Sequence, residues 1–294
     1  MDLSIIIVNY KSKDSTDICI KSIYENTDNI CFEIIVVDNN SDDGCINMLK
    51  EKYPSVKGYQ NNKNAGFAGG SNIGIKMSCG RYILLLHPDA VIHEKALGKM
   101  VQFMDANAHV GIAGCRVENP DGTIQRACRR SISPPMQALL RLLGIRRLLP
   151  KKRGAPRKYK YSDIRENRQI DVDAVSSAFL MFRSEVLEDV GGLDENYLIY
   201  GVDLDFCYKV RSKRWKVKYY PEARITHFKG QSSKHQGMKA TKAFYDSMAI
   251  FFCRNIEKKT FFPMRFLVYF IIWFLKQIAI FKEMIKNKCN GGHK

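Results

Sequence analysis

Three short apolar runs constrain the fold of this chain more than any other feature. They read SIIIVNY (4–10), FEIIVVDNN (32–40) and RYILLLHPD (81–89), and each is continuously apolar before it ends in polar residues. Continuous runs rich in Ile, Val and Leu are typical of parallel strands that are buried on both faces of a sheet. The runs therefore predict three central strands of a parallel sheet.

The segments between these runs have the composition of helices. Residues 12–27 begin with the N-cap candidates Ser12, Asp14 and Ser15, and residues 41–53 begin with the cap candidate Ser41. Alternating strands and helices are typical of a doubly wound α/β sheet with right-handed crossovers. Ligands of such folds bind in the crevice outside the carboxyl ends of the strands.

Polar residues end all three runs, and we expect them to face one crevice. They are Asn9, Asp38 and Asp89. The alternative interpretation is that each caps a helix or closes a turn. A buried, unpaired carboxylate is unfavourable by several kcal/mol, and a Mg²⁺ or Mn²⁺ ion shared with a diphosphate would relieve this at Asp89. Asp89 therefore suits a site for a nucleoside diphosphate.

Two later segments carry candidates for acid–base and metal chemistry. The segment YLIYGVDLDFCYKV places Asp203 and Asp205 two residues apart, so one can act as a general base while a basic neighbour or the backbone holds the other. His227, in ITHFKGQSS, is a candidate second metal ligand beside Asp89. The alternatives are a plain helix cap for Asp203 and a structural role for His227.

The segment NNKNAGFAGGSNIG (61–74) is rich in glycine, which lets the backbone approach a ligand closely. It matches neither G-x-G-x-x-G nor the P-loop pattern, and no glycine turn follows the first run. A dinucleotide-dependent dehydrogenase is therefore not expected.

Charge and cysteine content bound the partners and the compartment. The net charge is +17, and much of it lies in the basic segment 141–168, which indicates a face for phosphates of nucleic acid or anionic lipid, or else a solvated loop. No nucleic-acid recognition module accompanies it, so we do not expect nucleic-acid binding. Nine scattered cysteines without a C-x-x-C pair indicate reduced thiols, and the N-terminus does not resemble a secretory signal, so we expect a cytoplasmic protein.

The C-terminal segment FFPMRFLVYFIIWFLKQIAIFKEMIKNK (261–288) is strongly apolar but contains Pro263, Arg265 and Lys276. Its unbroken apolar stretch, 266–275, is about half of the ~20 residues that a membrane-spanning helix needs. We therefore predict an amphipathic helix at a membrane surface. The alternative is a helix that packs in the core or in a homodimer.

Six segments, in this order, resemble the family-2 glycosyltransferases, in particular the bacterial rhamnosyltransferase-like branch. They are SIIIVNY, IIVVDNNSDDG, NKNAGFAGGSNIG, ILLLHPDAVI, VGGLDENYLIYGVDLDFCYKV and ITHFKGQSS, and the resemblance covers roughly residues 1–255. It implies a type A glycosyltransferase fold with a mixed sheet, a nucleoside-diphosphate sugar donor, a divalent cation (Mn²⁺ or Mg²⁺) and inversion at the anomeric carbon.

The resemblance also implies a division of the chain. Residues 1–255 would form the catalytic domain, with a nucleotide-sugar half at about 1–115 and an acceptor half at about 116–255. Residues 256–294 would form the C-terminal helix at the membrane surface or in a dimer.

The resemblance assigns roles to seven residues. By this reasoning, Asp203 is the catalytic base, Asp89 and His227 bind the metal beside the diphosphate, and the nucleotide sugar contacts Asn9, Asp38, Asn64, Gly66 and Asp89. Two positions depart from the family pattern. His87 stands where the branch has asparagine, and Val202 replaces the glutamate that precedes the base.

The expected activity is transfer of a sugar, with rhamnose from dTDP-rhamnose as the first candidate, to a growing, lipid-linked cell-surface glycan. Galactose, galactofuranose and amino sugars fit the same motifs. The enzyme would then lie peripherally on the inner face of the cell membrane. Val202 and His87 support a second hypothesis, in which the chain is a catalytically impaired nucleotide-sugar-binding scaffold in a polysaccharide assembly complex.

Overall fold

The computed structural model describes residues 1–132, 166–228 and 237–290 of the chain. The basic segment 141–168 therefore lies outside the described residues, except for its last three. The described strands are β1 (Leu3–Asn9), β2 (Phe32–Asp38), β3 (Lys57–Gln60), β4 (Tyr82–Leu86), β5 (Ala90–Ile92), β6 (Val110–Glu118), β7 (Ile170–Asp171), β8 (Phe179–Arg183) and β9 (Lys216–His227). The helices are α1 (Lys13–Asn26), α2 (Cys45–Lys52), α3 (Gly66–Met77), α4 (Ala96–Ala106), α6 (Val186–Val190), α7 (Val202–Ser212), α8 (Gly237–Asn255) and α9 (Phe262–Asn290), with short 3-10 turns at Arg126–Cys128 and Glu257–Lys259.

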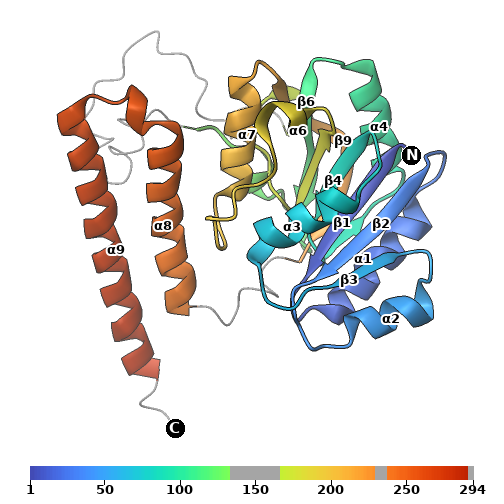
Figure 1. Cartoon of the computed structure of the whole chain (residues 1–294), viewed down its shortest axis with the longest axis horizontal. Coiled ribbons are helices and arrows are strands. Elements are labelled where there is room, and N and C mark those ends of the chain that lie inside the picture. The colour runs from blue at the N-terminus through green and yellow to red at the C-terminus, as the bar shows by residue number, and fades with distance from the viewer. Residues whose placement is uncertain (133–165, 229–236, 291–294) are drawn as a thin grey trace.

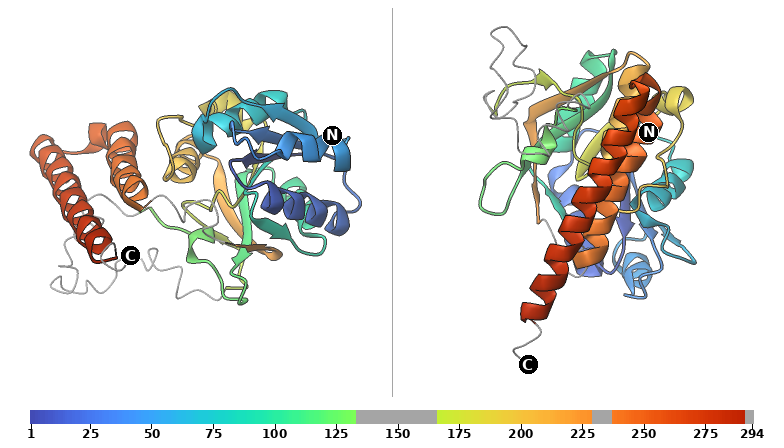
Figure 2. Two further views of the ribbon diagram at one scale, coloured as in Figure 1. Left: turned by 90° about the horizontal axis from the view of Figure 1, so that it is seen from below. Right: turned by 90° about the vertical axis from the view of Figure 1, so that its left-hand side faces the viewer.

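The strands form one mixed sheet in the order β3-β2-β1-β4-β8-β6-β9-β5, with β7 paired to β9. The three apolar runs form β1, β2 and β4, which are mutually parallel as predicted and almost completely buried. Strand β8 runs antiparallel to both β4 and β6, so the sheet is mixed. Helices cover both faces of the sheet (Figures 1 and 2). The mixed α/β fold is confirmed.

Helix α3 packs close to β1 because two of its four glycines face that strand. A Cβ atom at Gly74 would overlap Cγ2 of Ile6, and one at Gly70 would lie 2.7 Å from Cγ1 of Val8. Both strand residues are buried and β-branched, so they have little freedom to move aside. These two glycines therefore serve helix–sheet packing, whereas the sequence analysis related the glycine-rich segment to a ligand.

We predict that Gly74→Ala lowers the free energy of unfolding by ~1–3 kcal/mol, the usual cost of overpacking a core. Gly98→Ala in α4 is the matched control, because its Cβ would meet only the carbonyl oxygen of Asp28, at 3.6 Å. The control should be neutral or up to ~1 kcal/mol more stable, since alanine favours a helix over glycine. Urea unfolding of both variants checks this, and equal stabilities would show that α3 has room to move.

The two C-terminal helices α8 and α9 lie side by side at one end of the molecule (Figure 1). Val268 and Ile272 of α9 pack against Phe252 of α8 in a small separate core. Helix α9 packs on α8 rather than on the sheet (Figure 2). The predicted division at residue 255 falls between the two helices and stays a prediction.

Helix α9 is continuous, although Arg265 and Lys276 interrupt its apolar sequence. The ammonium group of Lys276 pairs with Asp246 of α8 at 2.5 Å. A 24-residue part of the helix, Phe262–Ile285, has a mean hydropathy of 1.7, and only 17% of its apolar stretch is buried inside the molecule. By length and composition alone, this part could cross a membrane. Its exposed apolar side chains include those of Phe262, Phe266, Phe270, Trp273, Phe274, Phe281 and Ile285.

Candidate active site

The carboxyl ends of β1 and β2 bring the first two predicted site residues together. Asn9 and Asp38 are opposite each other in the parallel register, and the amide of Asn9 donates to Asp38 Oδ1 at 2.6 Å. Asn9 is fully buried, and its amide oxygen accepts hydrogen bonds from Ser12 and Thr16. Asn9 therefore holds both Asp38 and the first residues after β1 in place.

Asp38 is held as a carboxylate by hydrogen bonds. It accepts the backbone N–H of Ser41 at 3.0 Å and the side-chain amide of Gln60 at 2.7 Å, and the Ser41 hydroxyl also donates to it. Burial raises the pKa of Asp38, but these hydrogen bonds outweigh burial and lower the pKa below its usual value. Ser41 was predicted to cap α2. That prediction is wrong, because α2 begins only at Cys45 and the Ser41 hydroxyl binds Asp38 instead.

The start of α3 lies beside this pair. Asn64 is exposed, and its Oδ1 accepts the backbone N–H of Gly66 at 2.9 Å. Gly66 has a φ of +71°, which favours glycine, and its carbonyl accepts the side chain of Asn39 at 2.8 Å. The structure thus joins Asn64 and Gly66 to the residue that follows Asp38. Their predicted contact with a nucleotide sugar stays a prediction.

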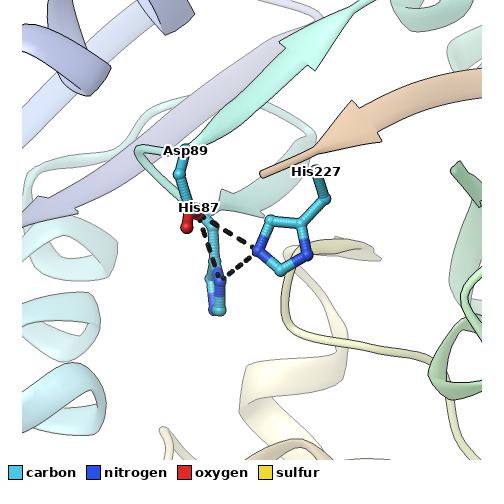
Figure 3. Close-up of side chains that lie close together, drawn as sticks. All are labelled: His87, Asp89 and His227. Carbon is cyan, nitrogen blue, oxygen red and sulfur yellow. Dashed lines mark hydrogen bonds and ion pairs between the residues drawn. The ribbon is translucent and has the colours of Figure 1, made fainter. Parts of the chain in front are cut away.

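Three potential metal ligands converge at the end of β4 and at the paired strands β5 and β9. Figure 3 shows His87, Asp89 and His227 pointing toward a common centre. His227 Nε2 lies 3.1 Å from Asp89 Oδ1 and 3.2 Å from His87 Nδ1, and the third separation, His87 Nδ1 to Asp89 Oδ1, is 3.9 Å. The antiparallel pairing of Ala90 with His227 fixes this arrangement. Asp89 and His227 therefore lie together, as predicted.

The electrostatics of this cluster suit a cation. Burial raises the pKa of Asp89, but the hydrogen bond from His227 and the two neighbouring imidazoles lower it by more, so the carboxylate is ionised at neutral pH. Burial, and then repulsion by His227, lower the pKa of His87 to about 4. His87 is therefore neutral at pH 7, the form in which imidazole binds metals.

Asp203, the predicted base, is the second residue of α7. It is buried and pairs with the Arg130 guanidinium at 2.5 Å. Its two oxygens also accept the backbone N–H groups of Ser177, at 3.1 Å, and Leu204, at 2.8 Å. Burial raises the pKa of Asp203, but Arg130 and the two backbone N–H groups outweigh burial, and the net pKa is lowered. Its neighbour Asp205 instead binds Lys209 and other groups of the fold.

Ser177 connects the base candidate to the metal-ligand cluster. Its backbone N–H binds Asp203, and its hydroxyl lies 3.2 Å from His87 Nε2. The Phe67 ring, next to Gly66, meets the His87 ring edge-on, with 5.3 Å between the centroids. Asp203, the metal-ligand cluster and the start of α3 therefore form one continuous site.

Sequence reasoning missed three residues of this site. Arg130 pairs with Asp203, Ser177 joins Asp203 to His87, and Gln125 binds both the ring and the carbonyl of His227. Gln125 and Arg130 both lie in the segment DGTIQRACRR, where two polar residues bracket a buried cysteine. The burial is known only from the structure, so the sequence alone offered no signal that singled out these two residues.

Two curated proteins are similar to this chain in sequence. It is 28% identical over 223 residues to the low-salt glycan biosynthesis hexosyltransferase Agl10 of Haloferax volcanii, which covers 74% of this chain and 64% of the relative. It is 23% identical over 230 residues to the N-acetylglucosaminyl-diphospho-decaprenol L-rhamnosyltransferase of Mycobacterium tuberculosis. This alignment covers 74% of this chain and 73% of the relative. The chain thus spans less than two thirds of the length of the first relative.

Solved structures support the type A fold. The mannosyltransferase PcManGT from Pyrobaculum calidifontis, in complex with GDP-Man and Mn²⁺, matches with a TM-score of 0.60 at 14% identity, over 99% of this chain and 75% of that chain. TarS 1–349 of S. aureus, in complex with UDP-GlcNAc, matches with a TM-score of 0.56 at 18% identity. The match covers 85% of this chain and 65% of the TarS chain. At these identities the likeness shows the fold alone.

The sequence profile named "Glycosyl transferase family 2" matches residues 4–191, which is more than half of the chain. The matched range contains β1, β2 and β4, together with Asp38 and Asp89 at their ends. The chain therefore belongs to glycosyl transferase family 2.

Proposed function

We propose that this chain transfers a sugar from a nucleoside-diphosphate donor to a growing cell-surface glycan on a lipid carrier, with inversion at the anomeric carbon. Rhamnose from dTDP-rhamnose is the first candidate. One observation carries the proposal. Ser177 contacts both Asp203 and His87, and so links the candidate base to the cluster of His87, Asp89 and His227. Rhamnose and the lipid carrier are supported by the name of the Mycobacterium tuberculosis relative.

The chemistry needs a base for the acceptor hydroxyl and positive charge for the leaving group. Asp203, ionised at neutral pH, would accept the proton of the acceptor hydroxyl as that oxygen attacks the anomeric carbon. Asp89 and His227 would hold a divalent cation, which supplies charge stabilisation to the departing diphosphate. Asp38 and the start of α3 would bind the nucleoside end of the donor.

The experiment that tests this function is a donor screen. The purified protein is incubated with a panel of nucleoside-diphosphate sugars, with and without Mn²⁺ or Mg²⁺, and thermal stabilisation and release of the nucleoside diphosphate are measured. We expect one donor, dTDP-rhamnose first, to stabilise the protein only with cation and to release its diphosphate slowly. No stabilisation by any donor would contradict the proposed function.

A scaffold function is the second candidate, and the observation that favours it is Val202. This residue is buried at the start of α7. The rhamnosyltransferase-like branch, which this chain resembles, has a glutamate at this position before the base. A scaffold would bind the donor with cation but would neither hydrolyse nor transfer it to any acceptor. The same screen, extended to lipid-linked acceptors, separates the two functions.

We further propose that α9 holds the protein at the cytoplasmic face of the membrane. Its outward side chains are large and apolar, and the pairing of Lys276 with Asp246 neutralises the charge within the apolar stretch. Aromatic and aliphatic side chains of this kind insert at the boundary of headgroups and acyl chains. The basic segment 141–168 would add attraction to anionic lipid.

For this surface we predict that the double variant Phe270→Ser, Trp273→Ser binds vesicles of phosphatidylcholine and phosphatidylglycerol at least about tenfold more weakly. Burying one such side chain contributes ~1.5–3 kcal/mol, and both are more than half exposed, at 57% and 55%. Ile18→Ser in α1 is the matched control, since Ile18 is 58% exposed and far from α9 in the chain. Co-sedimentation at 0.15 M salt measures the binding.

Three results would redirect this proposal. Equal sedimentation of the double variant and wild type would show that α9 does not contact the membrane. A wild-type dimer in lipid-free sedimentation velocity, converted to a monomer by the double variant, would assign the same face to a homodimer. Resistance of wild type to alkaline extraction from vesicles would indicate that α9 crosses the bilayer instead of lying on its surface.

A further inference from the structure

We infer that His87 is a third protein ligand of the divalent cation, and that His87, Asp89 and His227 together select transition-metal cations such as Co²⁺ and Zn²⁺ over Mg²⁺. The inference rests on the proposed function for the presence of a cation beside the donor diphosphate. It goes further in assigning His87, which stands where the resembling branch has asparagine.

The three ligand atoms have the spacing of a coordination face. The separations among His87 Nδ1, Asp89 Oδ1 and His227 Nε2 are 3.1, 3.2 and 3.9 Å (Figure 3). A circle through three points so spaced has a radius of about 2.0 Å, which matches the usual metal–nitrogen and metal–oxygen distances of ~2.0–2.2 Å. One cation can therefore contact all three atoms without any side chain moving far.

Gln125 fixes the tautomer of His227. The His227 carbonyl can only accept a hydrogen bond, so the Gln125 side-chain nitrogen, 2.8 Å away, must face it. The Gln125 oxygen then faces His227 Nδ1 at 3.0 Å and accepts its proton. A cation would therefore take the place of the Nε2 proton that otherwise bonds to Asp89, and would bind the Nε2 lone pair. A hydrogen bond that orients a ligand imidazole through its other ring nitrogen is typical of metal sites.

Two contacts hold the His87 ring with Nδ1 toward the same centre. The Ser177 hydroxyl lies 3.2 Å from Nε2 and can accept its proton, and the Phe67 ring packs against the imidazole edge-on. The side chain is 30% exposed, so the cluster remains open to an incoming ion and to a diphosphate. Two imidazole nitrogens and one carboxylate thus converge, and all three would face a bound cation as acceptors.

The donor set determines the expected selectivity. Mg²⁺ prefers oxygen ligands and keeps several of its waters, whereas imidazole suits Co²⁺, Ni²⁺ and Zn²⁺. A site with one imidazole and one carboxylate needs the donor's phosphates to complete it. His87 adds a second imidazole and so makes a site with three protein ligands. We expect this site to bind Co²⁺ before any nucleotide is present.

The test measures cation binding directly and does not rely on activity. Binding of Co²⁺ and Mg²⁺ to the nucleotide-free protein is followed by titration calorimetry, and bound Co²⁺ by its visible absorption. Wild type should bind Co²⁺ at least about 100-fold more tightly than Mg²⁺. His87→Asn should weaken Co²⁺ binding at least about tenfold, the lower end of the loss seen for residues that only support a ligand. Mg²⁺ binding by that variant should change much less.

The matched control is His93→Asn. His93 bonds to Thr226, beside His227 on β9, but it is not a member of the cluster, so Co²⁺ binding should be unchanged. Equal Co²⁺ affinity of His87→Asn and wild type, with donor binding still cation-dependent, would overturn the role of His87 and leave the proposed function standing. No cation dependence of donor binding in wild type would overturn both. If His87→Asn does not fold, the Co²⁺ to Mg²⁺ ratio of wild type decides, and a ratio near one overturns the inference.

Discussion

Replacing Asp203 by asparagine is expected to reduce the turnover of sugar transfer by about 10²–10⁴-fold, the usual contribution of a general base. Asparagine keeps the shape of the side chain, but its single oxygen can accept only one of the backbone N–H groups of Ser177 and Leu204, and it cannot take a proton. Donor affinity should change little, since no described contact joins Asp203 directly to Asp38 or Asp89. Steady-state kinetics and donor titration measure the two quantities separately.

Asp205→Asn is the matched control for this experiment. Asp205 lies on the same helix and is equally buried, but its partners are Lys209, Tyr197 and Asn255. Its replacement should lower stability without a comparable loss of turnover in the folded enzyme. Unchanged turnover in Asp203→Asn would remove Asp203 from the role of base.

The pKa of Asp203 also predicts a pH dependence of stability. Its pKa is lower in the folded protein than the usual value of 3.8, because Arg130 and two backbone N–H groups outweigh burial. Such a carboxylate stabilises the fold above about pH 4, and this contribution is lost as the pH falls through the folded pKa. The stability deficit of Asp203→Asn should therefore be largest near pH 7 and should shrink below pH 4 in urea unfolding.

Asp89→Asn is expected to abolish the cation dependence of donor binding and to lower activity at least about 100-fold. Loss of a group that merely orients a ligand costs ~10–100-fold, and Asp89 supplies the only carboxylate of the three-residue cluster. Chelation of the cation should inactivate wild type, and Mn²⁺ should restore it, whereas Mn²⁺ should not restore Asp89→Asn. Activity assays after chelation and readdition of metal check both statements.

Asp121→Asn serves as the control for Asp89→Asn. Asp121 is exposed in the turn after β6 and bonds only to Thr123 among the described residues. Its replacement should leave cation binding and activity unchanged. Full activity of chelated wild type would contradict metal dependence, and cation-dependent donor binding by Asp89→Asn would exclude Asp89 as a ligand.

The sequence predicted the parts of the fold that depend on local pattern. Continuous apolar runs identified β1, β2 and β4, and the polar residues Asn9 and Asp38 at the ends of β1 and β2 meet as predicted. Strand β3 was missed because it is an exposed edge strand without an apolar run. Lys276 made the C-terminal apolar run look short, although lysine favours helices and Asp246 neutralises its charge.

The site was predicted only as far as family motifs extend. Asp89, Asp203 and His227 lie in such motifs, and the structure brings all three to one place. Arg130 and Gln125 act through tertiary contacts with residues far away in the chain, as in the pair of Arg130 with Asp203. A sequence pattern carries no information about such contacts unless a motif already encodes them.

The pairing of β5 with β9 has a consequence for how the protein matures. Asp89 and His227 are 138 positions apart and meet only because Ala90 pairs with His227 in the antiparallel register. Closing so long a loop has an entropic cost, so we expect this contact to form late in folding. A chain still on the ribosome, with β9 not yet made, lacks His227, one of the three side chains of the proposed cation site. We therefore expect cation binding to require that synthesis has passed β9 and that β5 has paired with it.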